Sequence, residues 1–196
     1  KDEELMEMKA NAGFVRVFLG IETFNRLALK ECRKLQNLGC DLVECVHKIL
    51  RHGIDVASGF IVGFDSDPPD TFADDMICNV QATGITMAMV DTLQAQVGTE
   101  LHSKLAKQGR LLRTAGSNMD CLPNFETTMP AETLKKGYKR ILMTIYSPRK
   151  YYERICNFLE RYDSSRRKKR KLTTTEIRAL LKSILWIGIL GGVKVS

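Results

Sequence analysis

Two glycines and an isoleucine within one apolar segment have the residue types and spacing to hold a flat ligand. Residues 59–67 read GFIVGFDSD, in which Gly59 and Gly63 lack a Cβ atom and Ile61 lies between them. Backbone without Cβ lets an aromatic ring such as adenine approach closely, although glycines in a strand also mark bulges or tight helix packing. The segment predicts a buried strand whose carboxyl end opens into a ligand site.

Carboxylates at two predicted strand ends offer further chemistry. Glu22 follows a strand directly, where its side chain could accept hydrogen bonds from a ribose diol or an amine, or simply be a favourable charge at the start of the next helix. Asp65 and Asp67 could bind a metal ion or exchange protons, provided that both are exposed. Six cysteines at irregular spacings and three histidines without ligand spacing predict no metal site and no catalytic histidine.

The positive charge of the chain is concentrated in one block. The formal net charge is +7, and residues 166–171 read RRKKRK. We interpret residues 163–171 as a solvated basic linker; the alternative is a non-catalytic α/β binding module that uses this block to contact nucleic acid or anionic surfaces. No disulfide framework or signal peptide is visible, which favours a cytoplasmic setting. The apolar run at residues 184–190 is too short to span a membrane.

Strand and helix patterns alternate over the first part of the chain. Strands are predicted at residues 14–21, 54–62 and 85–93, and helices at residues 41–53, 71–83 and 99–108. This alternation predicts an α/β fold with a parallel sheet. After an irregular stretch, helices are predicted at residues 130–146, 148–162 and 173–187. Because Lys1 already lies inside an amphipathic pattern, we expect the chain to be a piece of a longer protein.

Several segments, taken in order, resemble the later strands of radical S-adenosylmethionine enzymes. They are FLGIET at residues 18–23, KLQN at 34–37, GFIVGFDSD at 59–67 and QVGTELHSKLAKQGRLL at 96–112. The longer SGFIVGFDSDPPDTF, together with IYSPRKYYER at residues 145–154, is similar to the cobalamin-binding-domain branch, which includes hopanoid methylases and anaerobic cyclase-like proteins. The resemblance implies a partial (β/α) barrel with parallel strands, in which residues 1–112 form the C-terminal half of the complete barrel. Residues 113–196 would then form an irregular connector and a helical C-terminal extension.

The resemblance also implies which residues contact S-adenosylmethionine. Glu22 and Thr23 match the position that contacts its ribose or amino group, and Lys34 matches a basic residue placed against its carboxylate. Gly59, Ile61 and Gly63 match the motif that supports the adenine, and Leu93 falls in the strand region beside the same ring.

The chain departs from the family pattern at the iron–sulfur site. The motif CxxxCxxC does not occur in it, and Cys40 and Cys45 cannot replace that motif. Ser66 stands where the fifth-strand motif usually has glutamate, and residues 97–99 read VGT where Pro-Gly-Thr is usual. The resemblance therefore implies that a [4Fe–4S] cluster and cobalamin are bound upstream, in a full-length parent protein.

The function implied is that of a radical S-adenosylmethionine enzyme fragment. It would bind S-adenosylmethionine at its strand ends for 5′-deoxyadenosyl-radical or cobalamin-dependent methyl-transfer chemistry, and would be inactive alone. The partners implied are a small-molecule substrate, the upstream domains and an electron donor such as flavodoxin or ferredoxin, with no specific nucleic acid. Residues 118–129, including Asn124 and Phe125, are hypothesised to form a lid facing the substrate or cobalamin.

Overall fold

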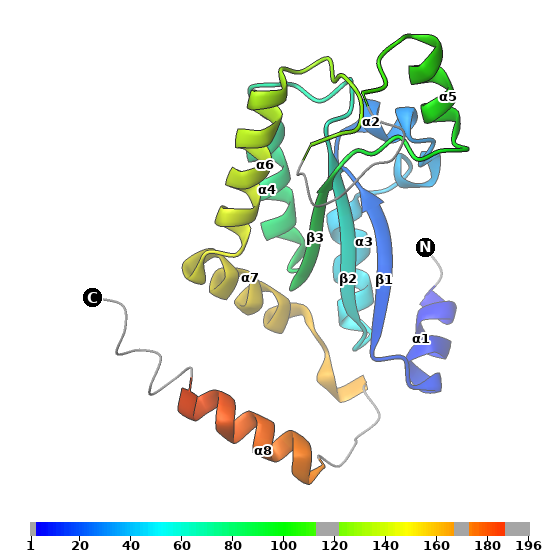
Figure 1. Ribbon diagram of the computed structural model, residues 1–196. Helices are drawn as coiled ribbons and strands as arrows, with labels where there is room; N and C mark the ends of the chain where they lie inside the picture. The colour runs from blue at the N-terminus through cyan, green and yellow to red at the C-terminus, as the bar shows by residue number, and fades with distance from the viewer. Residues whose placement is uncertain (1–2, 113–121, 167–172, 187–196) are drawn as a thin grey trace.

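Three parallel strands form the centre of the computed structural model, which describes residues 3–112, 122–166 and 173–186 (Figure 1). Strands β1 (Arg16–Glu22), β2 (Asp55–Val62) and β3 (Met87–Thr92) pair in the order β1-β2-β3. The predicted α/β fold with parallel strands is confirmed. The first strand begins later than predicted, because Gly13 at φ +92° ends α1 (Glu3–Ala12) and the amide of Phe14 still donates to the Lys9 carbonyl.

Helices α3 (Leu42–Arg51) and α4 (Phe72–Thr83) cover one face of this sheet. Helix α3 begins where expected, since the Asp41 side chain accepts hydrogen bonds from the amides of Val43 and Glu44. The shared core contains residues from both helices and from all three strands. Its fully buried members include Val46, Leu50, Ile54, Val56, Phe60, Val80, Ile85 and Ala88.

The opposite face of the sheet is largely uncovered by the described residues. Phe18, Met87 and Met89 are 59%, 43% and 49% exposed, whereas their strand neighbours Ile21 and Val90 point into the core. Side chains alternate between the two faces of a strand, so the exposed set lies on one side. Within the part of the chain that the structure describes, helices therefore cover one side of the sheet only.

Helix α6 (Ala131–Ile145) closes the edge of the sheet at β3. The Tyr146 hydroxyl donates to the Ala88 carbonyl at 2.8 Å and accepts from the Ala88 amide at 3.2 Å, while the Tyr138 hydroxyl donates to the Val90 carbonyl. These bonds occupy the edge groups that a further strand would need. Gly137 permits the close packing, because a Cβ there would lie 2.1 Å from the Phe72 ring of α4.

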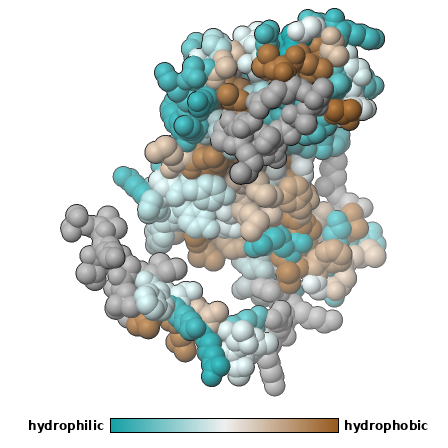
Figure 2. Space-filling model, viewed as in Figure 1, coloured by the Kyte–Doolittle hydropathy of each residue, from teal (hydrophilic) through white to brown (hydrophobic). Residues whose placement is uncertain are grey.

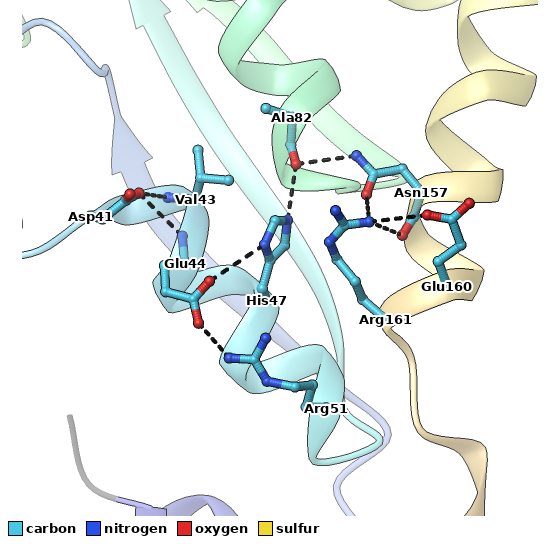
Figure 3. Close-up of polar contacts among 9 residues, drawn as sticks. All are labelled: Asp41, Val43, Glu44, His47, Arg51, Ala82, Asn157, Glu160 and Arg161. Atoms are coloured by element: carbon cyan, nitrogen blue, oxygen red, sulfur yellow. Dashed lines mark hydrogen bonds and ion pairs between the residues drawn. The ribbon is translucent and has the colours of Figure 1, made fainter.

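Helix α7 (Pro148–Arg161) is fastened to the C-terminal end of α4 (Figure 3). His47 Nε2 donates to the Ala82 carbonyl at 2.9 Å, and the Asn157 amide donates to the Gln81 and Ala82 carbonyls. These carbonyls lie in the last turn of α4, where helix carbonyls run short of backbone partners, and side chains from α3 and α7 supply hydrogen bonds to them.

The remaining elements are short or peripheral. Helix α2 (Arg26–Glu31) and the 3-10 turn Leu35–Asn37 follow β1 and were not predicted, because neither is long enough to show helical periodicity. Helix α5 (Glu100–Lys107) follows β3, a 3-10 turn spans Ser164–Arg166, and α8 (Thr174–Ser183) is the last described helix. Among the described residues, no helix is long and apolar enough to cross a membrane.

Candidate functional site

The strand ends predicted to bind a ligand converge at one end of the sheet. Figure 1 shows α2 and α5 at the end toward which the strands point. Leu93 extends β3 beyond its last residue, since its amide donates to the Val62 carbonyl at 2.8 Å. The carboxyl ends of parallel strands are where α/β proteins commonly hold their ligands.

Glu22 and Lys34 form an ion pair above the uncovered face of β1. The Lys34 Nζ atom lies 3.0 Å from Glu22 Oε1, and neither side chain is fully buried. A Cβ at Gly20 would lie 2.8 Å from Glu22 Oε1 and 3.1 Å from Lys34 Nζ. The absence of a side chain at Gly20 therefore leaves the space that the ion pair occupies.

An unusual backbone conformation at Glu22 directs its side chain toward Lys34. Its φ of +67° lies in the left-handed region that non-glycine residues seldom adopt, and the β1–β2 register shifts between Gly20 and Glu22. Such bulges at strand ends often redirect a side chain. Lys34 is brought in by the segment after α2, where the Asn37 side chain donates to the Ile21 carbonyl at 3.2 Å.

Small residues form the floor beside this ion pair. Gly20 pairs with Gly59, and Gly59 pairs with Met89, so the three lie in one row across the sheet. Ile61 lies two residues beyond Gly59 on the same face and is paired with Asp91. The structure thus places the Glu22–Lys34 ion pair over Gly20, next to Gly59 of β2, with Ile61 farther along the same strand. The contacts of these residues with a cofactor stay predictions.

Thr23, Gly63 and Leu93 contact other parts of the protein. Thr23 is 3% exposed and its hydroxyl accepts from the Asn25 amide, beside a cavity of about 410 Å³ that α4 also lines. Gly63 has φ +97°, and a Cβ there would lie 3.1 Å from Leu134 of α6. Turn geometry and helix packing thus explain the glycine at position 63, and the contacts of Thr23 and Gly63 with a cofactor stay predictions.

Leu93 lines a second cavity of about 400 Å³ between α2 and α5. Phe64, Leu105 and Phe125 supply much of its apolar wall, and Arg33 and Glu100 form an ion pair at 2.6 Å among its lining residues. Burial raises the pKa of the Cys32 thiol, which also lines this cavity. A contact between Leu93 and adenine stays a prediction.

Asp65 and Asp67 build the loop after β2 and do not form an exposed pair. Asp67 is 7% exposed and accepts from the Gly63 and Phe64 amides at 2.8 and 3.1 Å, while burial raises its pKa. Asp65 binds Arg110 through both oxygens at 2.7 and 2.8 Å, which lowers the pKa of Asp65 to about 2. Within the described ranges, no group of three or more His, Cys, Asp or Glu residues could hold a metal ion.

Sequence reasoning missed the structural importance of Asn124. Its side-chain oxygen accepts from the Ala95 amide at 2.8 Å and its side-chain nitrogen donates to the Ala95 carbonyl at 3.0 Å. Asn124 and Phe125 are 1% and 3% exposed and pack against the loop after β3, and Phe125 also lines the second cavity. A contact of either residue with substrate or cobalamin stays a prediction. Residues 118–121 of the hypothesised lid lie outside the described residues, as do residues 167–171 of the basic block.

A family model described as a domain of unknown function, DUF4070, matches residues 99–196, which is half of the chain. The chain belongs to the DUF4070 family. Because this domain is found in cobalamin-binding radical S-adenosylmethionine enzymes, the resemblance to that branch is confirmed. The DUF4070 match begins just before α5 and includes α6, α7 and α8.

Two curated relatives carry methyltransferase names. This DUF4070 protein is 33% identical over 155 residues to an uncharacterized methyltransferase of Synechocystis, covering 78% of this chain and 29% of that protein. It is 29% identical over 205 residues to the hopanoid C-2 methylase of Rhodopseudomonas palustris, covering 100% of this chain and 38% of that protein. The chain therefore spans only about a third of the length of these relatives.

Proposed function

We propose that this chain forms the S-adenosylmethionine-binding and substrate-closing part of a radical S-adenosylmethionine methyltransferase. The observation that carries the proposal is the Glu22–Lys34 ion pair over Gly20, beside Gly59 and Ile61. The methyltransferase names of the relatives support methylation as the overall reaction.

The charges of the site match the methionyl end of S-adenosylmethionine. That end carries an ammonium and a carboxylate, and Glu22 and Lys34 offer the opposite charges 3.0 Å apart. Bound ligand would replace part of their mutual contact with one charge-assisted hydrogen bond for each group. Glu22 would orient the amino group or the ribose, and Lys34 the carboxylate.

The surface around Gly59 suits the adenine ring of S-adenosylmethionine. A Cβ at Gly59 would lie 3.4 Å from the Phe18 ring, which is ordinary contact distance, so a flat group would approach the glycine backbone beside that ring. Ile61 presents an apolar side chain on the same face, and such a surface excludes water from one side of a ring. The residues present therefore fit the cofactor.

S-adenosylmethionine supplies a methyl group or, on one-electron reduction, a 5′-deoxyadenosyl radical. The described residues would bind and orient it, and the helices of the DUF4070 match would hold the strand ends in place. We propose that the [4Fe–4S] cluster and cobalamin are bound by parts of the full-length protein upstream of this chain.

The test is anaerobic reconstitution of the full-length protein with iron, sulfide, cobalamin, S-adenosylmethionine and a low-potential reductant. The proposal predicts 5′-deoxyadenosine or S-adenosylhomocysteine among the products, and loss of both in a Glu22→Gln variant that still folds. Bound S-adenosylmethionine with neither product would overturn the proposal.

A further inference from the structure

Helix α8 carries an apolar stripe that nothing in the described residues covers. Ile177, Leu180, Leu181 and Ile184 follow helical spacing and are 43%, 55%, 61% and 52% exposed. None of the helix's residues is buried, and Figure 2 shows apolar side chains along it. Spacings of three and four residues place these side chains on one face.

The sequence nevertheless specifies the start of this helix with a capping box. Thr173 and Glu176 form a capping box, in which the Thr173 hydroxyl accepts from the Glu176 amide and the Glu176 carboxylate accepts from the Thr173 amide. A helix of this length is marginal in water without a surface to bury its apolar face. The stripe therefore requires an occupant.

The charges around the stripe favour a lipid surface over a protein. Arg178 and Lys182 lie four residues apart beside the stripe, and the only acid of the helix, Glu176, is engaged in the cap. Residues 166–171 of the sequence are all lysine or arginine, so the chain that leads into the helix is cationic as well. Two copies of α8 brought face to face would place these like charges together, which disfavours a self-complementary dimer.

The end of the helix has the residue types of a membrane interface. Leu185 and Trp186 are 47% and 64% exposed directly after the stripe. Tryptophan is enriched at membrane–water boundaries, and helices with a basic polar face and an apolar face lie in the plane of anionic bilayers. We propose that α8 is an interfacial helix that docks this protein on bilayers with anionic headgroups.

The single tryptophan of the chain, Trp186, is an exposed fluorescence probe at the end of this helix. We expect its fluorescence emission to shift to the blue when phosphatidylcholine vesicles containing phosphatidylglycerol are added, and the protein to float with them. Binding should weaken steeply on raising the salt concentration and be far weaker with phosphatidylcholine alone.

A matched pair of substitutions separates docking from folding. Leu181→Asn removes one side chain of the stripe and should weaken vesicle binding about tenfold, whereas Ala179→Asn on the opposite face should change it less than about twofold. Equal effects of the two substitutions, no emission shift, or equal binding to neutral vesicles would each overturn the proposal. An emission shift that follows protein concentration without vesicles, with a dimer in sedimentation, would assign the stripe to a second copy and also overturn it.

Discussion

The ammonium of Lys34 and the carboxylate of Glu22 meet 3.0 Å apart in the space that a side chain at Gly20 would fill. The two residues come from separate segments, and the left-handed backbone of Glu22 turns its side chain back over the strand. Three features thus depend on one another: a glycine, a strained residue and a basic partner. The first prediction concerns that glycine.

Gly20→Ala should separate ligand binding from stability. The new Cβ would meet only the flexible ends of Glu22 and Lys34, which can move, so the free energy of unfolding should fall by less than about 1 kcal/mol. The displaced ion pair should weaken S-adenosylmethionine binding about tenfold. Urea unfolding and equilibrium dialysis on the same variant check both, and unchanged affinity would contradict the placement of the site.

Asp65→Asn should lower stability in a pH-dependent way. The Arg110 guanidinium holds the pKa of Asp65 at about 2, below its ordinary value, so the stabilisation is present above the ordinary pKa and is lost as the pH falls through about 2. Because the pair is partly exposed, we expect the substitution to cost only about 1 kcal/mol at neutral pH.

The measurement for this variant is urea unfolding at neutral pH and near pH 2, where the difference from the natural chain should shrink toward zero. Asp74→Asn is the matched control, because the Asp74–Arg140 pair is exposed on both sides. A difference that is the same at both pH values would show that Asp65 stabilises the loop by packing and not by charge.

Asn124→Ala should be among the more damaging substitutions in the connector. It leaves the buried amide and carbonyl of Ala95 without their partners, which should cost about 2 to 3 kcal/mol of unfolding free energy. Asn79→Ala, which removes a bond to an exposed helix carbonyl, should cost less than about 0.5 kcal/mol. Equal costs would mean that the connector does not clamp the strand end.

Tyr146→Phe should unblock the edge of the sheet at β3. The ring and its contact with Arg154 remain, but the Ala88 amide and carbonyl lose their hydrogen-bond partner, at a cost of about 1 to 3 kcal/mol. Unpaired strand edges also promote association, so light scattering should rise on storage. A variant as stable and monodisperse as the natural chain would show that water can replace the Tyr146 hydroxyl as hydrogen-bond partner of Ala88.

Regular elements were predictable because their signals are local. Residues 54–62 are rich in β-branched and aromatic residues, and the spacing of Val46, Ile49 and Leu50 is helical, so β2 and α3 could be predicted closely. The meeting of Glu22 and Lys34 could be expected only from the family resemblance, because it depends on a register shift and a positive φ.

Side-chain partners far apart in sequence were not predictable. Asp65 looked like part of a carboxylate pair until Arg110, from the segment after α5, proved to bind it through both oxygens. Asn124 looked like a loop residue, and no periodic pattern marks a clamp on Ala95. Such contacts are fixed by tertiary packing, which a single sequence does not display.

Binding of labelled S-adenosylmethionine by equilibrium dialysis tests the central claim most directly. The protein should bind it saturably, and Glu22→Gln should weaken the affinity about tenfold or more. Glu153→Gln, which alters the exposed Lys150–Glu153 pair of α7, should change the affinity less than about twofold. No saturable binding, or equal affinity in the natural chain and the Glu22→Gln variant, would contradict the account.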